Sequence, residues 1–306
     1  MNFNRGVFST GQKVFMKNAD IKDPEFLAAV EAIDSGNLPA LKTFTGQYPR
    51  LVTQRLDHPA PGYFKNPYLL WFIAGNPVRH QKLPANIADI TQFLIGAVQQ
   101  HSPASFQEQL DYTLGLVVTG RVPRENGVQI TLIDLLIDAG AKPGNGHGAI
   151  AHGNLAAAER LVERGGSLTL ATAICLNKTN DILSLAKEST MADREIALVA
   201  AAFYGKAEML TFIINIGVNV NAYPDPAGGF HSHATALHQA VFSGSLEAVK
   251  VLVAARADTG ATDLIYKGTP LGWAQHMQIE IGDAAVKKKY AAIEAFLRSK
   301  ASAKFF

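Results

Sequence analysis

Apolar positions along the chain recur with helical spacing. Leu237, Ala240 and Val241 share one helix face at i, i+3 and i+4. A second set with the same kind of spacing follows, made of Leu246, Val249, Leu252 and Val253. The string Ser243-Gly244-Ser245 between them is a turn signal. The pattern predicts a helix, a tight turn and a second helix.

This pattern is repeated along the sequence. Residues 236–244 align with residues 197–205 at an offset of 39 residues, with the glycines Gly244 and Gly205 in register. Another copy begins at His147, a last one begins at Thr269, and weaker copies fill the rest. We count about eight repeats. Because one hairpin cannot bury its own apolar stripe, the repeats are predicted to stack on their neighbours.

Several short motifs resemble the ankyrin repeat. They are Thr269-Pro270-Leu271, Leu237-His238, the glycine in the middle of each repeat, and Gly140-Ala141 after a second helix. The order of repeats and insertions resembles bacterial ankyrin-repeat proteins of unassigned function. The resemblance implies that the His238 ring hydrogen-bonds the backbone of the adjoining turn.

The predicted fold is an all-α ankyrin-repeat solenoid. Short first helices would line a concave face, longer second helices a convex face, with finger loops between repeats. Residues 25–300 are expected to form the array. Residues 1–24 would be an N-terminal extension, with a cap over the first repeat as one option, and residues 301–306 a C-terminal tail.

Insertions at residues 76–86, 121–129 and 277–286 separate the two helices of three repeats. Solenoids tolerate surface insertions, since each repeat contacts only its neighbours. The alternative is that these loops add partner contacts.

Two long connections, residues 56–66 and 223–233, combine prolines, glycines and aromatic residues, which predicts shaped turns. In an ankyrin array they would be enlarged fingers whose rings anchor a protein partner, or whose rings pack on a neighbouring finger. The candidate contact residues here are Tyr63, Phe64, Tyr223, Phe230 and His231.

Aromatic and amide residues recur near the end of the first helices, where they would face the concave groove. They are Phe72, Phe203, Tyr204, Gln239, Phe242, Trp273 and His276. One hypothesis is an aromatic groove for a peptide or a protein surface. The alternative is burial against the adjacent first helix.

Composition narrows the function. The 306 residues are 48% hydrophobic with a net charge of +2, which is too balanced for an electrostatic nucleic-acid binder. The longest apolar runs are too short to cross a membrane, and the first residues do not form a signal peptide pattern, so a cytoplasmic location is expected. The single cysteine, Cys175, excludes an intrachain disulfide and is expected to be buried and inert.

Three sequence patterns could indicate a metal site, a phosphate-binding loop or an acid/base pair, but each fits another explanation better. His231, His233 and His238 have spacing H-x-H-x₄-H, but an acidic residue to complete a metal site is distant in sequence. The glycines at 144–148 fit a helix stop better than a phosphate loop. Asp134 and Asp138 favour a solvated helix face over an acid/base pair. We therefore expect no metal and no cofactor.

The primary hypothesis is a non-enzymatic scaffold that binds an unidentified protein or peptide through its groove and fingers, with no nucleic acid or membrane partner. The alternative is an enzyme or small-molecule/metal-binding protein with a pocket formed by loops 76–86 and 223–233. A homo-oligomeric role is a third possibility, and the oligomeric state stays open.

Overall fold

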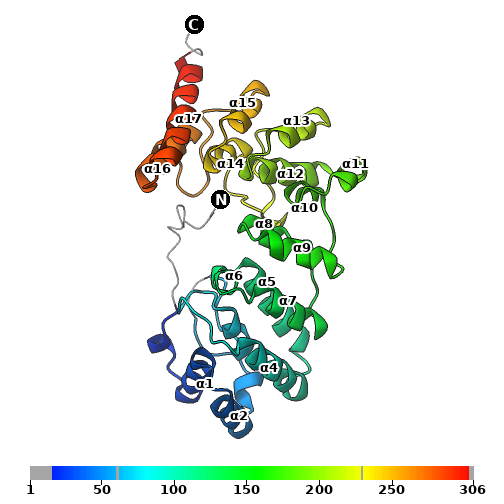
Figure 1. Cartoon of the computed structure of the whole chain (residues 1–306), viewed down its shortest axis with the longest axis vertical. Helices are drawn as coiled ribbons and strands as arrows, with labels where there is room; N and C mark the ends of the chain where they lie inside the picture. Colours follow the sequence, from blue (N-terminus) through cyan, green and yellow to red (C-terminus); the bar gives the residue numbers. More distant parts are fainter. Residues whose placement is uncertain (1–15, 60–61, 229, 303–306) are drawn as a thin grey trace. The chain divides into compact units, whose positions relative to one another are not determined.

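The structure is a computed structural model that describes residues 16–59, 62–228 and 230–302 (Figure 1). The expected tail and N-terminal extension lie partly outside these residues. Every regular element of the described ranges is helical, which confirms the predicted all-α class. Among the described helices, none is long and apolar enough to cross a membrane.

The chain divides into two compact units, with unit 1 ending at Ser167 and unit 2 beginning at Leu168. Unit 1 contains η1 (Asn18–Asp20), α1 (Pro24–Ser35), α2 (Leu38–Gln47), α3 (Arg50–Thr53), η2 (Leu69–Ala74), α4 (Ile87–His101), α5 (Phe106–Thr119), α6 (Arg121–Glu125), α7 (Gln129–Asp138), α8 (His147–Ala151) and α9 (Leu155–Glu163). Unit 2 contains α10 (Leu170–Cys175), α11 (Thr179–Glu188), α12 (Met191–Phe203), α13 (Ala207–Asn215), η3 (Pro226–Gly228), α14 (Ala236–Ser243), α15 (Leu246–Ala254), α16 (Pro270–Glu280) and α17 (Ala284–Ser302).

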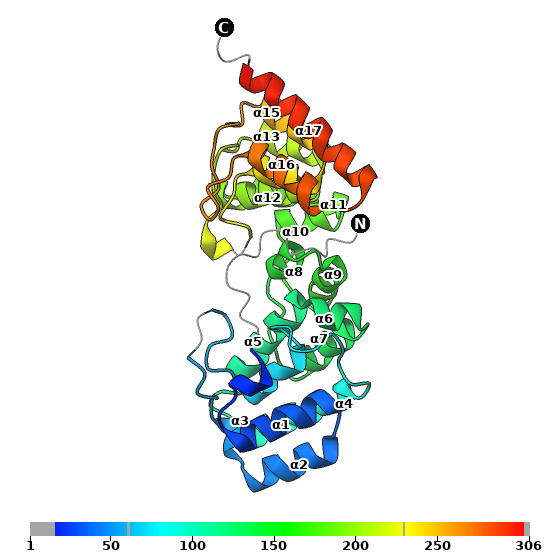
Figure 2. The same cartoon turned by 90° about the vertical axis from the view of Figure 1, so that its left-hand side faces the viewer.

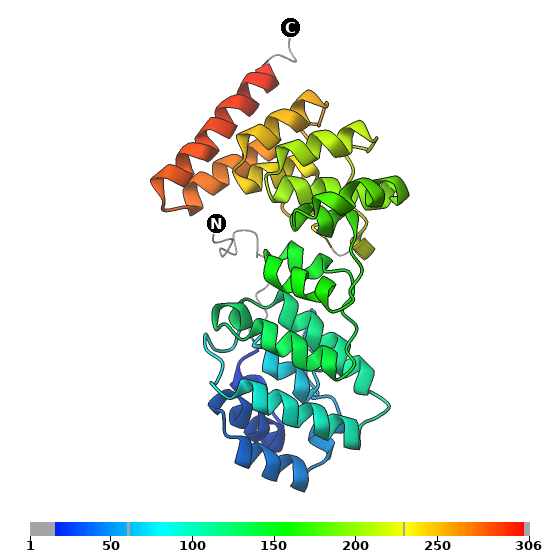
Figure 3. The ribbon, with the colours of Figure 1, turned by 45° about the vertical axis from the view of Figure 1, so that its right-hand side comes forward.

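Helices pair into hairpins that stack within each unit. In unit 2 the pairs are α10–α11, α12–α13, α14–α15 and α16–α17. Each first helix packs on the next first helix, and α13, α15 and α17 pack in order as second helices (Figure 3). Unit 1 follows the same rule, with η2 and α5 among its first helices and α4 and α7 among its second helices.

First helices are buried more completely than second helices. All residues from 196 to 203 in α12 are buried, and so are residues 236–241 in α14. Second helices bury one stripe only, such as Ala248, Val249 and Leu252 of α15. A helix that is apolar on all sides belongs in a core, whereas a striped helix faces solvent. The sequence pattern therefore places first helices inside each stack.

The backbone conformation of the turn explains why a glycine separates the two helices of a repeat. Gly205 and Gly244 adopt φ values of 64° and 71°, the left-handed region that glycine enters without steric cost. A Cβ on Gly205 would also lie 2.9 Å from the Ser245 Cβ of the next repeat. The turn predicted at these glycines is confirmed.

The insertion at residues 76–86 lies against unit 1. The Arg79 side chain is 4% exposed, and its Nη2 lies 2.5 Å from Asp34 Oδ1. Its guanidinium also lies 4.6 Å from the centre of the Phe72 ring. Asn86 Nδ2 donates to the Gly36 carbonyl oxygen at 2.9 Å. The segment is thus fixed by its own contacts, as expected of an insertion that belongs to the solenoid.

The second insertion contains the short helix α6. The third consists of the end of α16, the connection 281–283 and the first residues of α17. Neither adds a separate subdomain to the described residues.

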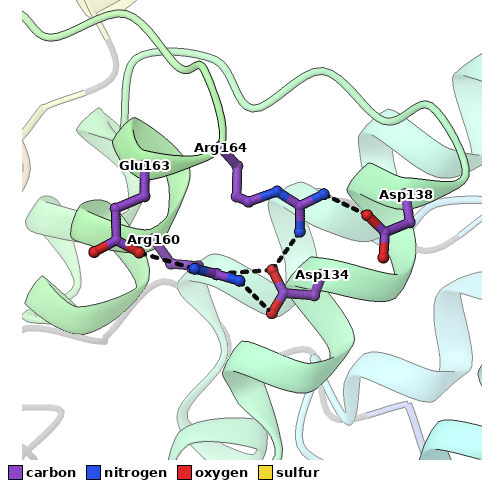
Figure 4. A network of polar contacts seen from close by, with 5 residues as sticks. All are labelled: Asp134, Asp138, Arg160, Glu163 and Arg164. Carbon is purple, nitrogen blue, oxygen red and sulfur yellow. Dashed lines mark hydrogen bonds and ion pairs between the residues drawn. The ribbon is translucent and has the colours of Figure 1, made fainter.

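Asp134 and Asp138 join two second helices of unit 1 (Figure 4). The Asp134 carboxylate accepts from Arg160 Nε at 2.8 Å and Nη2 at 2.9 Å, and from Arg164 Nη1 at 2.6 Å. Arg164 also contacts Asp138. The hydrogen bond from Arg160 is the largest cause of a lowered Asp134 pKa. The two aspartates therefore connect α7 to α9.

We expect Asp134→Asn to lower the urea midpoint of unfolding at pH 7, because three hydrogen bonds lose their anionic acceptor. The pKa of Asp134 is lower in the folded than in the unfolded protein. The stability that its carboxylate adds is therefore fully present above the unfolded pKa near 3.8, and it is lost as the pH falls through the folded pKa. The midpoint difference between wild type and variant should therefore shrink between pH 5 and pH 2.

Glu163→Gln is the matched control, because Glu163 makes a half-exposed ion pair with Arg160 at the edge of the same network. Exposed pairs contribute little. Equal midpoints for Asp134→Asn and Glu163→Gln would contradict a linking role for Asp134.

Candidate functional site

The structure divides the predicted contact residues into two groups. Six are buried in the core of their own unit: Phe64, Phe72, Phe203, Phe230, Gln239 and Trp273. Six keep accessible surface: Tyr63, Tyr204, Tyr223, His231, Phe242 and His276. A buried side chain presents no surface to a partner. Any contact surface made from this set therefore has to rest on the second group.

The buried rings of the long fingers pack on first helices. Phe64 lies 5.2 Å from Phe72 of η2, and Phe230 lies 5.9 Å from Phe203 of α12, ring centre to ring centre. Both pairs meet edge to face, the arrangement that the ring quadrupoles favour. The same arrangement occurs once in each unit, so the two long fingers are parts of the core as well as connections.

Around Phe64, unit 1 has a dense polar–aromatic cluster. Trp71 stacks on Tyr112 at 3.9 Å, and the Arg55 guanidinium lies 4.4 Å from the Tyr68 ring and 5.0 Å from the Trp71 ring. Tyr112 donates its hydroxyl to the Tyr63 carbonyl. This cluster holds the end of the finger, while the Tyr63 side chain stays 54% exposed.

In unit 2 two consecutive fingers are joined. We call residues 222–234 finger A and residues 257–269 finger B. The Leu264 amide of finger B donates to the His233 carbonyl of finger A at 2.8 Å. The Tyr223 hydroxyl of finger A donates to the Thr262 carbonyl of finger B at 2.7 Å. Each finger therefore supports the other.

Finger B is shaped by one carboxylate. Asp263 is fully buried and accepts hydrogen bonds from four donors. They are the backbone N–H groups of Ile265, Tyr266 and Gly268 at 3.0, 2.6 and 2.8 Å and the Trp273 indole at 3.0 Å. Burial raises the Asp263 pKa, but these bonds outweigh it and the net pKa is lowered. The carboxylate stays ionised near neutral pH and fixes the turn.

The tip of finger B presents two aliphatic side chains to solvent. Leu264 is 54% exposed and Ile265 is 57% exposed, directly after the buried Asp263. The sequence analysis did not select them. The signal in the sequence is a pair of adjacent large aliphatic residues in the connection between two predicted helices.

The predicted histidine interaction is present. His238 Nε2 lies 3.0 Å from the Gly268 carbonyl oxygen, and the Thr235 hydroxyl lies 2.8 Å from His238 Nδ1. Burial lowers the pKa of His238, which favours the neutral ring that fits these two partners. His238 thus fastens α14 to finger B.

His231 and His233 stand beside rings. The His231 ring lies 4.7 Å from the Phe203 ring, and the His233 ring lies 6.2 Å from the Trp273 ring. Within the described ranges, three or more His, Cys, Asp or Glu side chains nowhere gather in a way that could hold a metal ion. His231 and His233 contact aromatic rings, and His238 makes the two hydrogen bonds described above.

Cys175 is 1% exposed in α10, and burial raises its pKa to about 12. A thiol with such a pKa carries almost no thiolate near neutral pH. Among the charged groups near it, Lys206 favours the thiolate but does not offset burial. The thiol is buried, as its apolar sequence context predicts.

A family model described as ankyrin repeats in three copies matches residues 147–263. Residues 147–263 of the chain are ankyrin repeats. The matched region includes finger A, α14 and His238, while Gly268, whose carbonyl contacts His238, follows it in sequence. No curated protein sequence matches the chain.

Two solved structures are similar to this chain at low identity. The human ASB11 ankyrin repeat domain has 15% identity and a TM-score of 0.31, covering 89% of this chain and 98% of that one. The ankyrin repeat domain of Bcl-3 has 18% identity and a TM-score of 0.30, covering 87% and 96%. With both TM-scores below 0.5, neither likeness bears on the geometry of this chain.

We expect Asp263→Asn to destabilise the ankyrin repeats of unit 2 by about 2–4 kcal/mol in the free energy of unfolding, because buried donors lose their anionic acceptor. Denaturant unfolding followed by circular dichroism measures this. Asp57→Asn changes the charge equally at an exposed loop position and should have almost no effect.

The effect of Asp263→Asn depends on pH. Because the folded pKa is lowered, the stability from Asp263 is present above the unfolded pKa near 3.8 and is lost as the pH falls through the folded pKa. A loss of stability as small as that of Asp57→Asn at pH 7 would show that Asp263 does not hold the turn.

Proposed function

We propose that this protein is a non-enzymatic scaffold that binds another protein or peptide through unit 2. Ankyrin repeats are in general protein–protein interaction modules, which supports the class of function. The observation that carries the proposal is the tip of finger B, where Leu264 and Ile265 are exposed on a turn fixed by Asp263.

A rigid apolar tip suits binding for an energetic reason. Association costs conformational entropy whenever a flexible segment has to be ordered. The Asp263 hydrogen bonds already order finger B before a partner arrives. Leu264 and Ile265 can then lose solvent contact in the complex at little further cost.

Three half-exposed residues from the sequence analysis extend this surface in the proposal. Tyr204 and Phe242 lie at the ends of α12 and α14, and Tyr223 lies in finger A. Phe242 stacks on the buried Phe203 at 5.4 Å, so its position is fixed. Tyr63 of unit 1 and His231 of finger A stay candidates of the same kind.

The alternative hypothesis, an enzyme or small-molecule/metal-binding protein with a pocket formed by loops 76–86 and 223–233, has less support. Loop 76–86 packs on unit 1 through Arg79, and residues 223–233 pack on unit 2 through Phe230. The two loops that were expected to share a pocket belong to different compact units. We therefore favour a scaffold without catalytic activity; its source and its cellular location stay predictions.

The test compares which proteins are captured by the full wild-type chain and by the variant Leu264→Ser/Ile265→Ser. If the tip is a central contact, each substitution should cost about 2 kcal/mol of binding free energy, roughly 30-fold in Kd. The variant should unfold at the same temperature as wild type, because both side chains are more than half exposed.

Leu183→Ser/Ile279→Ser is the matched control, since Leu183 and Ile279 are 65% and 77% exposed in unit 2 but lie outside both fingers. A partner that is retained by the control and lost by the finger variant supports the proposal. A partner that both variants retain equally would remove finger B from the binding surface.

A further inference from the structure

Unit 2 has a pocket between two consecutive repeats. It encloses about 310 Å³ and is partly open to solvent. Its walls come from the hairpins α10–α11 and α12–α13, whose first helices α10 and α12 pack against each other (Figure 2). Sites that bind small molecules occupy about 300–1,000 Å³, so this pocket suits a ligand at the small end of that range.

At two other places in the chain, the residue before a second helix contacts an earlier turn directly. Asn86, which precedes α4, donates from Nδ2 to the Gly36 carbonyl at 2.9 Å. Ser245, which precedes α15, donates from its hydroxyl to the Gly205 carbonyl at 3.4 Å. A Cβ on Gly36 would lie 2.6 Å from Asn86 Oδ1, and one on Gly205 would lie 2.9 Å from the Ser245 Cβ. Neither turn therefore has room for a side chain.

The turn that borders the pocket is built differently. Asn177 stands where those turns have glycine, with a left-handed φ of 58°. Asparagine adopts this region more readily than most residues. Lys206, which precedes α13 as Ser245 precedes α15, donates from Nζ to Asn177 Oδ1. The pocket therefore has an amide and an ammonium where the other two turns have a hydrogen bond to a glycine carbonyl.

The Lys206 ammonium is partly withdrawn from water, and it has no carboxylate partner among the residues that the structure describes. Burial lowers the pKa of Lys206. The nearby Cys175 thiol adds no counter-charge, because burial raises the pKa of Cys175 to about 12 and keeps the thiol protonated. A partly buried cation is stabilised when an anion binds beside it. The ammonium therefore favours an anionic ligand.

The rest of the lining limits the ligand to one charge and an apolar body. Ile174 of α10 and Ile182 of α11 are buried at the pocket, and Met209 of α13 is half-buried. Glu208 also lines the pocket, and its carboxylate repels a ligand that has a second negative charge. A short alkyl chain can bury its surface on the three apolar side chains.

We propose that this pocket binds a small aliphatic monocarboxylate. The carboxylate accepts hydrogen bonds from Lys206 Nζ, which has further protons to donate, and from Asn177 Nδ2, while Asn177 Oδ1 holds Lys206. The alkyl chain lies on Ile174, Ile182 and Met209. Such a group occurs in a free short-chain acid and at the C-terminus of a protein that ends in an aliphatic residue. The site goes beyond the proposed scaffold function, because its residues belong to neither finger.

The experiment titrates the full chain with isocaproate, a short branched carboxylic acid, and follows binding by saturation-transfer NMR. We expect saturable binding of isocaproate. Acetate, which lacks the chain, and isohexyl alcohol, which has the chain without the charge, should each bind at least about tenfold more weakly. The proposal is wrong if either of these compounds binds as tightly as isocaproate.

Lys206→Gln should weaken the binding of isocaproate at least about tenfold, because it removes a charge-assisted hydrogen bond. Lys250→Gln is the matched control, since it removes the same charge from unit 2. Lys250 lies on α15 in an exposed pair with Glu247 and does not line the pocket, so this variant should bind like wild type. Equal affinities of Lys206→Gln and Lys250→Gln would overturn the proposal.

Asn177→Gly is a second variant, and we expect it to fold. It gives this turn the glycine of other repeats at a φ of 58°, where glycine is unstrained. It removes the side-chain amide and with it the contact that holds Lys206. Circular dichroism shows that each variant is folded before it is titrated. The affinity of Asn177→Gly for isocaproate should fall about threefold or more; an unchanged affinity overturns the proposal.

A hexapeptide that ends in leucine distinguishes the two sources of the carboxylate. Tighter binding of the peptide than of isocaproate assigns the pocket to the C-terminus of a protein, and weaker binding of the peptide assigns it to a free acid. If neither compound binds, the proposal is overturned. None of these titrations involves Leu264 or Ile265, so their outcome is independent of the capture experiment, and either result can fail alone.

Discussion

Residues 170–175 of α10, 196–203 of α12 and 236–241 of α14 are buried on all sides, and this constraint governs the rest of unit 2. A helix rich in alanine, such as residues 196–203, has too little apolar surface to be stable alone. It gains that burial from the neighbouring first helices, from its own second helix and from finger A. The left-handed glycines in the turns and the fingers that pack on the first helices both allow this close approach.

This constraint also explains why aromatic residues lie where they do. Small alanines leave room above the first helices, and large rings fill it. In both units a ring of a long finger packs on a ring of a first helix: Phe64 on Phe72 in unit 1, and Phe230 on Phe203 in unit 2. A long connection that carries a ring can fold back on its own repeat, so length and aromatic content do not by themselves indicate an outward-pointing anchor.

Much of the fold could be predicted from the sequence because the repeat is local. Spacing of apolar residues, the glycines Gly205 and Gly244, and the Thr-Pro-Leu start of α16 are each determined by neighbouring residues. The candidate site was less predictable, because exposure depends on contacts between distant residues. Phe230 packs on Phe203, 27 positions earlier (230 − 203), and Leu264 is exposed because the Asp263 carboxylate turns inward. No periodicity encodes either choice.

Because Asp263 holds finger B, the shape of this finger does not depend on which side chains stand at its tip. The carboxylate holds the turn through backbone N–H groups and the indole of Trp273, and none of these bonds involves the Leu264 or Ile265 side chain. Those two positions are therefore free to drift in evolution without cost to folding. A descendant of this chain can change what it recognises by two substitutions, and an engineer can graft a new dipeptide there onto an unchanged frame.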